Sequence, residues 1–280
     1  MSAPFPGELA VVGLGLMGGS LAKAVRAASP GTRIVGVEAR PEAGEEARAA
    51  GAVDEVHQEP GPALSRCALA VLCAPVAAIE ALLGPVSALL PDGAVLTDVG
   101  GAKERLLAAA RRDVRPGVHF VGAHPMFGGH GGFAGSSAEK WRGGTVAVCT
   151  DGDGSAVDAV EAFHRALGAG VERCTAAEHD EAVAMVSHLP YLVASALASA
   201  TREAGPLAAK LAGPGLRDMT RLAAFPFDIQ GEVARRNDHL PAAAGRLGRH
   251  LDALLAAIAE SPGAARQALE AARTAREELF

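Results

Sequence analysis

Short apolar runs alternate with helix-like segments along the chain from Glu8 to about Cys174. The runs cover residues 9–12, 33–37, 69–73, 94–98, 119–123, 145–149 and 171–174. Strands that are apolar along their whole length, rather than in alternate positions, are typical of a parallel sheet with helices on both faces. The pattern therefore predicts an α/β domain with a mostly parallel sheet.

The strand-like runs stop after Cys174, and segments rich in Ala, Leu, Glu and Arg continue at helical spacing to Phe280. We therefore expect two domains, an α/β domain over residues 1–174 and an all-α domain over residues 175–280.

Several features of the helical segment can be placed more closely. Thr175 and Glu178 have the spacing of a capping box, which predicts that a helix begins there. Pro190 lacks a backbone N–H and is expected to bend that helix. Apolar side chains also recur at helical spacing further on, at Leu247, Leu251, Leu254, Leu255 and Ile258. This stripe needs a packing partner, and a second copy of the chain is the partner that we expect.

Composition narrows the range of functions. The net charge is −6 and Lys and Arg form no cluster, so nucleic acid is not an expected partner. The most apolar stretch, residues 67–90, is interrupted by Pro75, Glu80 and Pro85. We interpret it as a strand, a loop and a helix rather than a membrane span. The N-terminus lacks a basic segment followed by an apolar one, so we expect a cytoplasmic protein without a secretory signal.

The spacing of the cysteines argues against a disulfide-stabilised protein and against a zinc protein. The four cysteines are Cys67, Cys73, Cys149 and Cys174, and they include no C-x-x-C pair. Neither a disulfide framework nor a zinc site is expected from this spacing. We interpret the cysteines as small core residues.

A glycine-rich hexapeptide with the pattern G-x-G-x-x-G follows the first apolar run directly. It consists of Gly13, Leu14, Gly15, Leu16, Met17 and Gly18. The glycines allow a tight turn, close approach of backbone to a pyrophosphate and close packing of the next helix, whose N-terminus supplies free N–H groups. The motif predicts a dinucleotide site of the Rossmann type, to which we also assign Cys73 and Pro75. A tight turn that binds no dinucleotide is the alternative.

Glu38 ends the second run, about 20 residues after the glycines, where a carboxylate accepts hydrogen bonds from the adenosine ribose. Its negative charge repels a 2′-phosphate, so the sequence favours NAD over NADP. Arg40 works against this preference if it pairs with a phosphate. It is equally explained as a solvated cation or as a cover for the adenine.

His124 follows the run 119–123, at the carboxyl edge of the predicted sheet where open α/β folds bind their ligands. An imidazole titrates near neutral pH and can take a hydroxyl proton as hydride leaves the adjacent carbon. We therefore expect His124 to be the catalytic base. His130 is close in sequence, but no further ligand completes a metal set in this loop, so no metal is predicted.

Six segments in both domains together resemble one family, the prephenate and arogenate dehydrogenases of tyrosine biosynthesis. They are residues 13–20 (GLGLMGGS), 98–103 (DVGGAK), 124–128 (HPMFG), 179–180 (HD), 187–190 (SHLP) and 217–221 (RDMTR). The resemblance implies a Rossmann domain followed by a helical dimerisation domain, and a homodimer. It also implies NAD-dependent oxidative decarboxylation of prephenate to 4-hydroxyphenylpyruvate, of arogenate to tyrosine, or of an amino-substituted prephenate.

The resemblance assigns roles to individual residues. The histidine that matches His124 polarises or deprotonates the ring hydroxyl, and the arginine that matches Arg221 binds a carboxylate of the dicarboxylate substrate. Asp218 lies three residues before Arg221, on the same face of a predicted helix, and is a candidate to orient its guanidinium.

Further candidates lie around the predicted site. His188 and Tyr191 share one helix face and are expected to approach the substrate, and His130 lies near the position of a pocket-guarding glutamate in some members. His179 is half a helical turn out of phase with His188, so we do not expect the two to act together. Lys103 is expected to cap the start of a helix.

Three positions depart from the family pattern. Gly101 stands where a serine that bonds the catalytic histidine is common, Tyr191 where a histidine often follows SHLP, and Gln230 where a tryptophan is frequent. These departures bear on which substrate the protein accepts more than on the class of reaction that it catalyses.

Two other functions remain open. A β-hydroxyacid dehydrogenase relies on a lysine in the helical domain, where Lys210 is the one lysine present. A nucleotide-sensing dimer without catalytic activity is the other alternative. The chain ends at Phe280, after the predicted helices, so tyrosine inhibition, if present, is expected to act at the active site.

Overall fold

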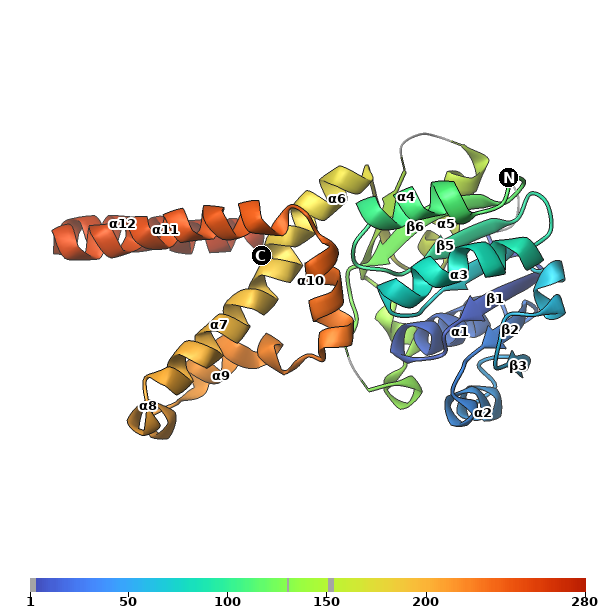
Figure 1. The fold of residues 1–280 in the computed structure, drawn as a ribbon, viewed down its shortest axis with the longest axis horizontal. Helices are drawn as coiled ribbons and strands as arrows, with labels where there is room; N and C mark the ends of the chain where they lie inside the picture. The colour runs from blue at the N-terminus through green and yellow to red at the C-terminus, as the bar shows by residue number, and fades with distance from the viewer. Residues whose placement is uncertain (1–3, 130, 151–153) are drawn as a thin grey trace.

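The computed structural model describes residues 4–129, 131–150 and 154–280. An α/β part is followed by a helical part, drawn in gold to red, which extends away from the sheet (Figure 1). The predicted fold class is confirmed.

The α/β part is built on one eight-stranded sheet with the order β3-β2-β1-β4-β5-β6-β7-β8. Its strands are β1 (Glu8–Val12), β2 (Arg33–Val37), β3 (Glu55–His57), β4 (Leu69–Leu72), β5 (Val95–Asp98), β6 (His119–Pro125), β7 (Thr145–Cys149) and β8 (Gly170–Cys174). All neighbouring pairs are parallel except β6 and β7. The three-residue β3 was not predicted, because it is too short to produce an apolar run.

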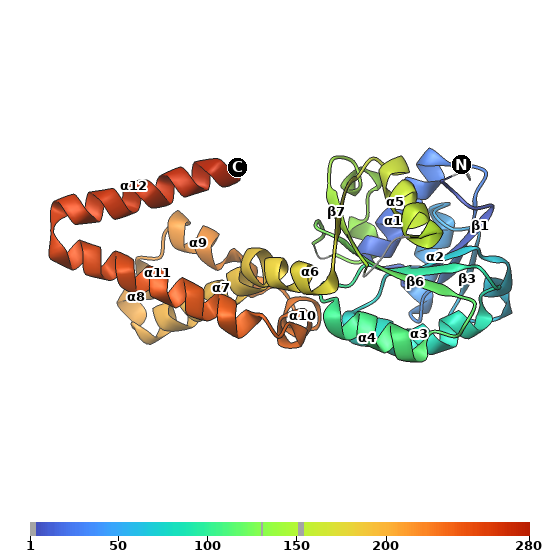
Figure 2. The ribbon, with the colours of Figure 1, turned by 90° about the horizontal axis from the view of Figure 1, so that it is seen from above.

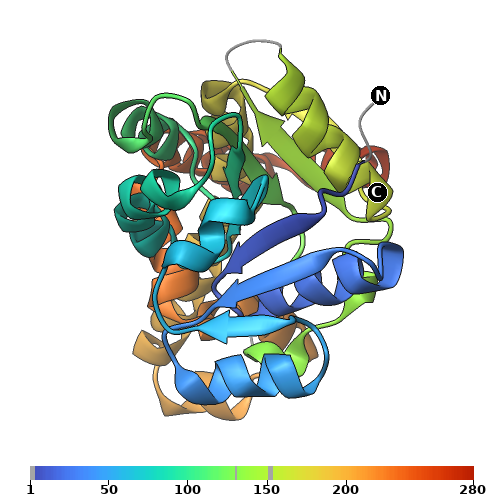
Figure 3. The same ribbon diagram turned by 90° about the vertical axis from the view of Figure 1, so that its right-hand side faces the viewer.

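Helices cover both faces of this sheet (Figure 3). They are α1 (Leu16–Ala28), α2 (Pro41–Ala49), η1 (Pro62–Arg66), α3 (Val76–Leu89), α4 (Glu104–Asp113), η2 (Phe133–Gly135), η3 (Ala138–Lys140) and α5 (Ser155–Ala166). Successive strand residues point to opposite faces, so Leu9 and Val11 join a core with α1 and α5, whereas Ala10 and Val12 join one with α3 and α4. This burial on both faces explains why the strands are continuously apolar.

The helical part begins directly after β8. Its elements are α6 (Ala176–Val183), η4 (Ala184–His188), α7 (Leu189–Glu203), α8 (Pro206–Lys210), α9 (Pro214–Thr220), η5 (Arg221–Ala224), η6 (Phe227–Gly231), α10 (Glu232–Arg236), α11 (Leu240–Glu260) and α12 (Pro262–Leu279). The predicted capping box is confirmed, since Thr175 Oγ1 accepts from Glu178 N–H at 3.2 Å and Glu178 Oε2 accepts from Thr175 N–H at 2.8 Å.

A π-helical turn, η4, joins α6 to α7. Pro190 lies just beyond it, and a proline has no N–H to continue the regular i to i−4 bonding and clashes with the carbonyl four residues earlier. The wider turn accommodates this defect. The interruption predicted at Pro190 therefore takes the form of an extra residue in the helix, which rotates every position beyond it.

The last two helices, α11 and α12, are joined at Ser261 at the far end of the molecule, contact each other and diverge towards the C-terminus (Figure 2). Part of the predicted apolar stripe stays exposed despite this contact. Leu251, Leu255 and Ile258 are 55%, 57% and 56% exposed. The partner that the stripe requires is therefore not supplied by this chain within the described residues.

One helical stretch in the described part of the chain, Ala176–Glu203, is long and apolar enough to cross a membrane by length and composition. Core helices of other proteins pass the same test, and this one carries the buried polar residues His179, Asp180 and His188. These polar side chains bond to other parts of the protein, so the stretch is weak evidence for a membrane span.

Candidate functional site

The glycine-rich turn lies between β1 and α1, next to the end of β4. Gly13 has φ +93°, and a Cβ on it would lie 2.5 Å from the Cys73 carbonyl oxygen. A Cβ on Gly18 would lie 1.8 Å from the Gly13 carbonyl oxygen. Neither position accepts a larger residue, because β1, β4 and α1 meet at this point.

Gly15, in contrast to Gly13 and Gly18, borders open space, since a Cβ built on it meets nothing within 4 Å. It is the N-cap of α1 and provides no side-chain hydrogen bond, so the first N–H groups of the helix face open space. The sheet order reverses between β1 and β4, which is where doubly wound sheets bind ligands. These features fit the pyrophosphate of a dinucleotide.

The other predicted cofactor residues surround this turn. Leu14 and Leu16 are buried, and the N–H of Leu14 donates to Glu38 Oε2 at 2.8 Å. Cys73 supports Gly13 through its carbonyl group, and Pro75 is the exposed N-cap of α3. Met17 is half-buried, with its Sδ 3.9 Å from the position of a Cβ on Gly128.

Glu38 ties the end of β2 to the glycine-rich turn. Its Oε2 accepts from Leu14 N–H at 2.8 Å, and its Oε1 accepts from Arg40 Nε at 2.9 Å. Burial raises the pKa of Glu38, but the hydrogen bonds from Arg40 and Leu14 outweigh it and hold the pKa below its usual value. A permanent carboxylate therefore stands where an adenosine ribose is expected, and Arg40 neutralises part of its charge.

His124 lies near the carboxyl end of β6, half-buried. The loop that follows His124 lies next to the glycine-rich turn, because a Cβ on Gly129 would lie 3.4 Å from Leu16 Cδ2. Burial lowers the pKa of His124 well below 6.5, and the neighbouring His179, Lys103 and His188 disfavour its protonation further. The imidazole is therefore neutral at physiological pH and able to accept a proton.

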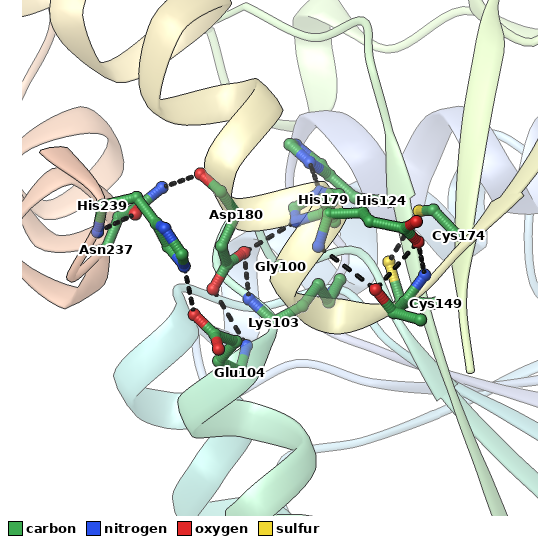
Figure 4. Close-up of polar contacts among 12 residues, drawn as sticks. Gly100, Lys103, Glu104, His124, Cys149, Cys174, His179, Asp180, Asn237 and His239 are labelled. Carbon is green, nitrogen blue, oxygen red and sulfur yellow. Dashed lines mark hydrogen bonds and ion pairs between the residues drawn. The ribbon is translucent and has the colours of Figure 1, made fainter. Parts of the chain in front are cut away.

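A second histidine and a carboxylate extend from His124 into the helical part (Figure 4). His124 Nδ1 lies 2.9 Å from His179 Nε2, and His179 Nδ1 lies 2.7 Å from Asp180 Oδ1. His179 and Asp180 are buried in α6. We refer to His124, His179 and Asp180 as the relay. The His-Asp pair belongs to the segments that resemble the family, but no role at the site was predicted for it.

The π-helical turn η4 changes the phase between His179 and His188. Nine residues separate His179 from His188, which places them on opposite faces of a regular helix. The extra residue in η4 turns the later positions back by about 100°. Both histidines lie close enough to His124 to influence its pKa. That His179 and His188 do not act together stays a prediction. Pro190 is the residue in the sequence that signals this break in the regular helix.

His188 is buried, and its environment lowers its pKa to about 4, chiefly through burial. Its Nδ1 lies 3.0 Å from Asn237 Nδ2, and a backbone hydrogen bond joins the ring to Gly101. Both sides of the ring therefore have protein partners, which favours support of the Gly101 turn over the direct substrate contact that we expected.

A buried ion pair lies on the sheet side of His124. Lys103 Nζ lies 2.6 Å from Asp98 Oδ2, and neither side chain is exposed. Asp98 also accepts from the N–H of Ala123, the residue before His124. Lys103 is the N-cap of α4, as expected, but its side chain points inward to this pair.

Asp218 lies on α9, and Arg221 follows directly at the start of η5. Arg221 opens η5, which packs on α7 and α9, and both side chains are exposed. Across residues 4–129, 131–150 and 154–280, neither side chain forms a hydrogen bond or ion pair, so the expected pairing of Asp218 with Arg221 is absent. The helix tightens to a 3-10 turn at Arg221, whose N–H donates to the Asp218 carbonyl, and this change of winding separates the two side chains.

The remaining residues that were singled out in the sequence are Tyr191, Lys210 and His130. Tyr191 is half-buried on α7, one turn after His188. Lys210 is exposed at the end of α8. His130 lies outside the described residues. Within them, no three His, Cys, Asp or Glu side chains are grouped to hold a metal ion.

The unusual residues Gly101 and Gln230 lie on different elements. A Cβ on Gly101 would lie 3.5 Å from His124 Nε2 and 3.3 Å from Val233 Cγ1, so little room for a larger side chain remains between the imidazole and Val233. Gln230 is in η6, where its Oε1 is buried without a partner among the described residues.

Fold and site together define a class: a two-domain protein with a Rossmann dinucleotide site and a helical second domain. The model of the prephenate dehydrogenase nucleotide-binding domain matches residues 21–173, and that of the prephenate dehydrogenase dimerization domain matches residues 175–265. The chain belongs to the prephenate dehydrogenase family.

Individual relatives agree with this assignment. The prephenate dehydrogenase of Bacillus subtilis is 29% identical over 223 residues, which are 76% of this chain and 59% of that protein. The chain thus spans less than two thirds of that relative. The crystal structure of Synechocystis arogenate dehydrogenase matches with a TM-score of 0.84 and 28% identity, over 98% of this chain and 100% of that one. Aquifex aeolicus prephenate dehydrogenase, solved with hydroxyphenyl propionate and NAD+, shares the fold at a TM-score of 0.91 and 24% identity over the full length of both chains.

Proposed function

We propose that this chain catalyses the NAD-dependent oxidative decarboxylation of a prephenate-type dicarboxylate, as a step of tyrosine biosynthesis. The observation that carries the proposal is the position of His124, a neutral imidazole at the carboxyl end of β6 whose following loop contacts the glycine-rich turn. Family membership supplies the reaction class, and the substrates follow from the names of the relatives.

The glycine-rich turn and Glu38 would hold the dinucleotide, with the pyrophosphate at the N-terminus of α1 and the adenosine ribose at the Glu38 carboxylate. When bound, NAD supplies a hydride acceptor for the ring carbon that carries the hydroxyl group. Glu38 disfavours a 2′-phosphate by charge, so NADP is the weaker ligand.

His124 takes the hydroxyl proton through Nε2, which lies next to Gly101. Loss of that proton and of hydride converts the alcohol into a ketone. The ring carboxylate then leaves as carbon dioxide, and its bonding electrons complete the aromatic ring. The proton on His124 returns to the new phenol oxygen, so the base is regenerated without net proton uptake.

Arg221 binds a carboxylate of the substrate. It is an exposed guanidinium without a competing carboxylate among the described side chains, so its donors are available to a ligand. Tyr191 and His130 are retained as substrate-side candidates, and His188 acts through the Gly101 turn.

We propose a homodimer formed through the helical part. The exposed side chains of Leu251, Leu255 and Ile258 provide an apolar face on α11, and the family model for this region is that of a dimerization domain. We place the dimer in the cytoplasm, with no membrane or nucleic-acid partner. Sedimentation as a monomer at micromolar concentration would contradict the dimer.

The alternatives have weaker support. A β-hydroxyacid dehydrogenase requires a lysine at the reacting centre, and Lys210 is exposed on α8. A sensor without activity does not require a neutral imidazole beside the dinucleotide turn.

Absorbance at 340 nm tests the proposal directly. Purified protein is supplied with NAD or NADP and, in turn, with prephenate, arogenate and 4-amino-4-deoxyprephenate. We expect NADH formation with at least one of them and a preference for NAD. Binding of NAD without turnover of any substrate would instead favour the sensor.

A further inference from the structure

Helix α6 carries both His179 and Asp180. Asp180 belongs to α6, yet its carboxylate caps α4 of the other domain. Its Oδ1 accepts from Lys103 N–H at 2.8 Å, and its Oδ2 accepts from Glu104 N–H at 2.9 Å (Figure 4). Lys103 and Glu104 form the N-terminus of α4, whose dipole also favours a negative charge. Asp180 is thus an ionised group that can only accept hydrogen bonds.

This charge determines the proton positions along the relay. Because the Asp180 carboxylate has no proton to give, His179 Nδ1 must donate across the 2.7 Å contact. When His179 carries a single proton and that proton is on Nδ1, its Nε2 has no hydrogen and accepts. The hydrogen in the 2.9 Å contact therefore belongs to His124 Nδ1, which leaves His124 Nε2 without a proton.

His124 has no other side-chain hydrogen-bond partner within the described residues. Gly101 offers none, although a Cβ there would lie 3.5 Å from the imidazole. The orientation of the ring consequently depends on His179. Asn237 holds the same region together, since its Nδ2 donates to the Asp180 carbonyl at 2.7 Å.

We propose that His179 and Asp180 are positioning residues that keep His124 in the tautomer with Nδ1 protonated and Nε2 free, and that this state forms only when α6 is docked on α4. The inference rests on the proposed role of His124 as a base. His179 and Asp180 touch neither substrate nor cofactor. They fix which nitrogen of His124 faces the substrate, and they stabilise the imidazolium that forms when His124 takes the proton.

Two substitutions at His179 separate positioning from folding. Asn in His179→Asn places its amide near the former Nδ1 and keeps a donor for Asp180, but it cannot reach His124. Gln in His179→Gln places its amide oxygen near the former Nε2 and restores an acceptor for His124. His239→Gln is the matched control, because His239 Nε2 contacts Glu104 Oε2 at 2.8 Å across the same domain interface without touching the relay.

Steady-state kinetics with NAD and the best substrate form the first arm. We expect His179→Asn to lower kcat by about 10²-fold with KM values changed by less than about twofold, and His179→Gln to recover about tenfold of this loss. His239→Gln should retain the wild-type kcat. Equal kcat values for His179→Asn and His239→Gln would overturn the proposal.

Nitrogen-15 NMR of histidine-labelled protein forms the second arm and needs no turnover. At neutral pH, the wild type should show His124 as the Nδ1–H tautomer, and His179→Asn should show a mixture of tautomers. A wild-type His124 with its proton on Nε2, or a cationic His179, would overturn the relay whatever the substrate. Failure of the wild type to oxidise any substrate would contradict the proposed function and leave this arm decisive for the relay.

Discussion

Lys103 Nζ lies 2.6 Å from Asp98 Oδ2, and both side chains are completely buried at the ends of neighbouring elements beneath His124. Asp98 also accepts from the N–H groups of Gly100 and Ala123, at 2.6 and 3.1 Å. A single carboxylate therefore connects β5, the turn that follows it and the strand that carries the proposed base. Within the described residues, Lys103 is the one cation that forms an ion pair with this buried carboxylate.

Loss of one partner of this pair should be costly. Lys103→Met leaves an uncompensated buried carboxylate, and we expect the free energy of unfolding in urea to fall by about 3–5 kcal/mol. The double variant Asp98→Asn/Lys103→Met removes both charges and keeps an acceptor for Gly100, so it should be more stable than Lys103→Met alone. Additive losses in the double variant would show that the two charges do not interact.

The carboxylate of Glu38 should set the cofactor preference. In Glu38→Ser, the ribose loses a charged acceptor, and Arg40 loses its partner at 2.9 Å and becomes available to a 2′-phosphate. We expect kcat/KM for NAD to fall by about tenfold or more while that for NADP rises. The two values are measured at 340 nm with the same substrate. An unchanged ratio would mean that Glu38 only supports the turn through Leu14.

Stability should fall with acid because of His164. This residue is fully buried, and burial lowers its pKa from 6.5 to about 4. The unfolded chain therefore binds a proton below pH 6.5 that the folded protein accepts only near pH 4. Stability from this group is complete above pH 6.5 and is lost as the pH falls towards 4, by about 2 kcal/mol at pH 5.

The neighbouring tryptophan provides both the probe and the control for this effect. Trp141 Nε1 donates to His164 Nδ1 at 3.2 Å, and Asn in His164→Asn retains an acceptor near that atom. Urea unfolding followed by Trp141 fluorescence should show a smaller loss between pH 7.5 and pH 5 in His164→Asn than in the wild type. His188, with a pKa of about 4, leaves part of the acid sensitivity in both proteins.

Arg221 should affect substrate binding and not cofactor binding. Arg221→Ala removes the proposed carboxylate contact, and we expect KM for the substrate to rise by about 10- to 100-fold while KM for NAD stays unchanged. Arg217→Ala is the matched control, since Arg217 is an exposed arginine one turn earlier on α9. Equal effects of the two substitutions would place the carboxylate site elsewhere.

The sequence predicts the α/β fold well because its signals are local. The glycines at positions 13 and 18 are required by contacts within the motif and with β4, and the apolar runs reflect burial on both faces of the sheet. The relay was harder to predict because it depends on contacts between distant parts of the chain. Asp180 meets the start of α4, and the π-helical turn changes the phase of His188, which a regular periodicity cannot express. The separation of Asp218 from Arg221 also follows from a departure from regular helix geometry, the 3-10 turn that begins at Arg221.

The role of His124 is tested most directly by single-turnover oxidation in His124→Asn, with enzyme in excess over substrate and NAD saturating. Asn cannot accept the hydroxyl proton, so the rate of NADH formation should fall by about 10²- to 10⁴-fold, with carbon dioxide release falling in parallel. NAD affinity, measured by calorimetry, should be unchanged because His124 lies outside the glycine-rich turn. A His124→Asn rate within tenfold of the wild type would contradict the account.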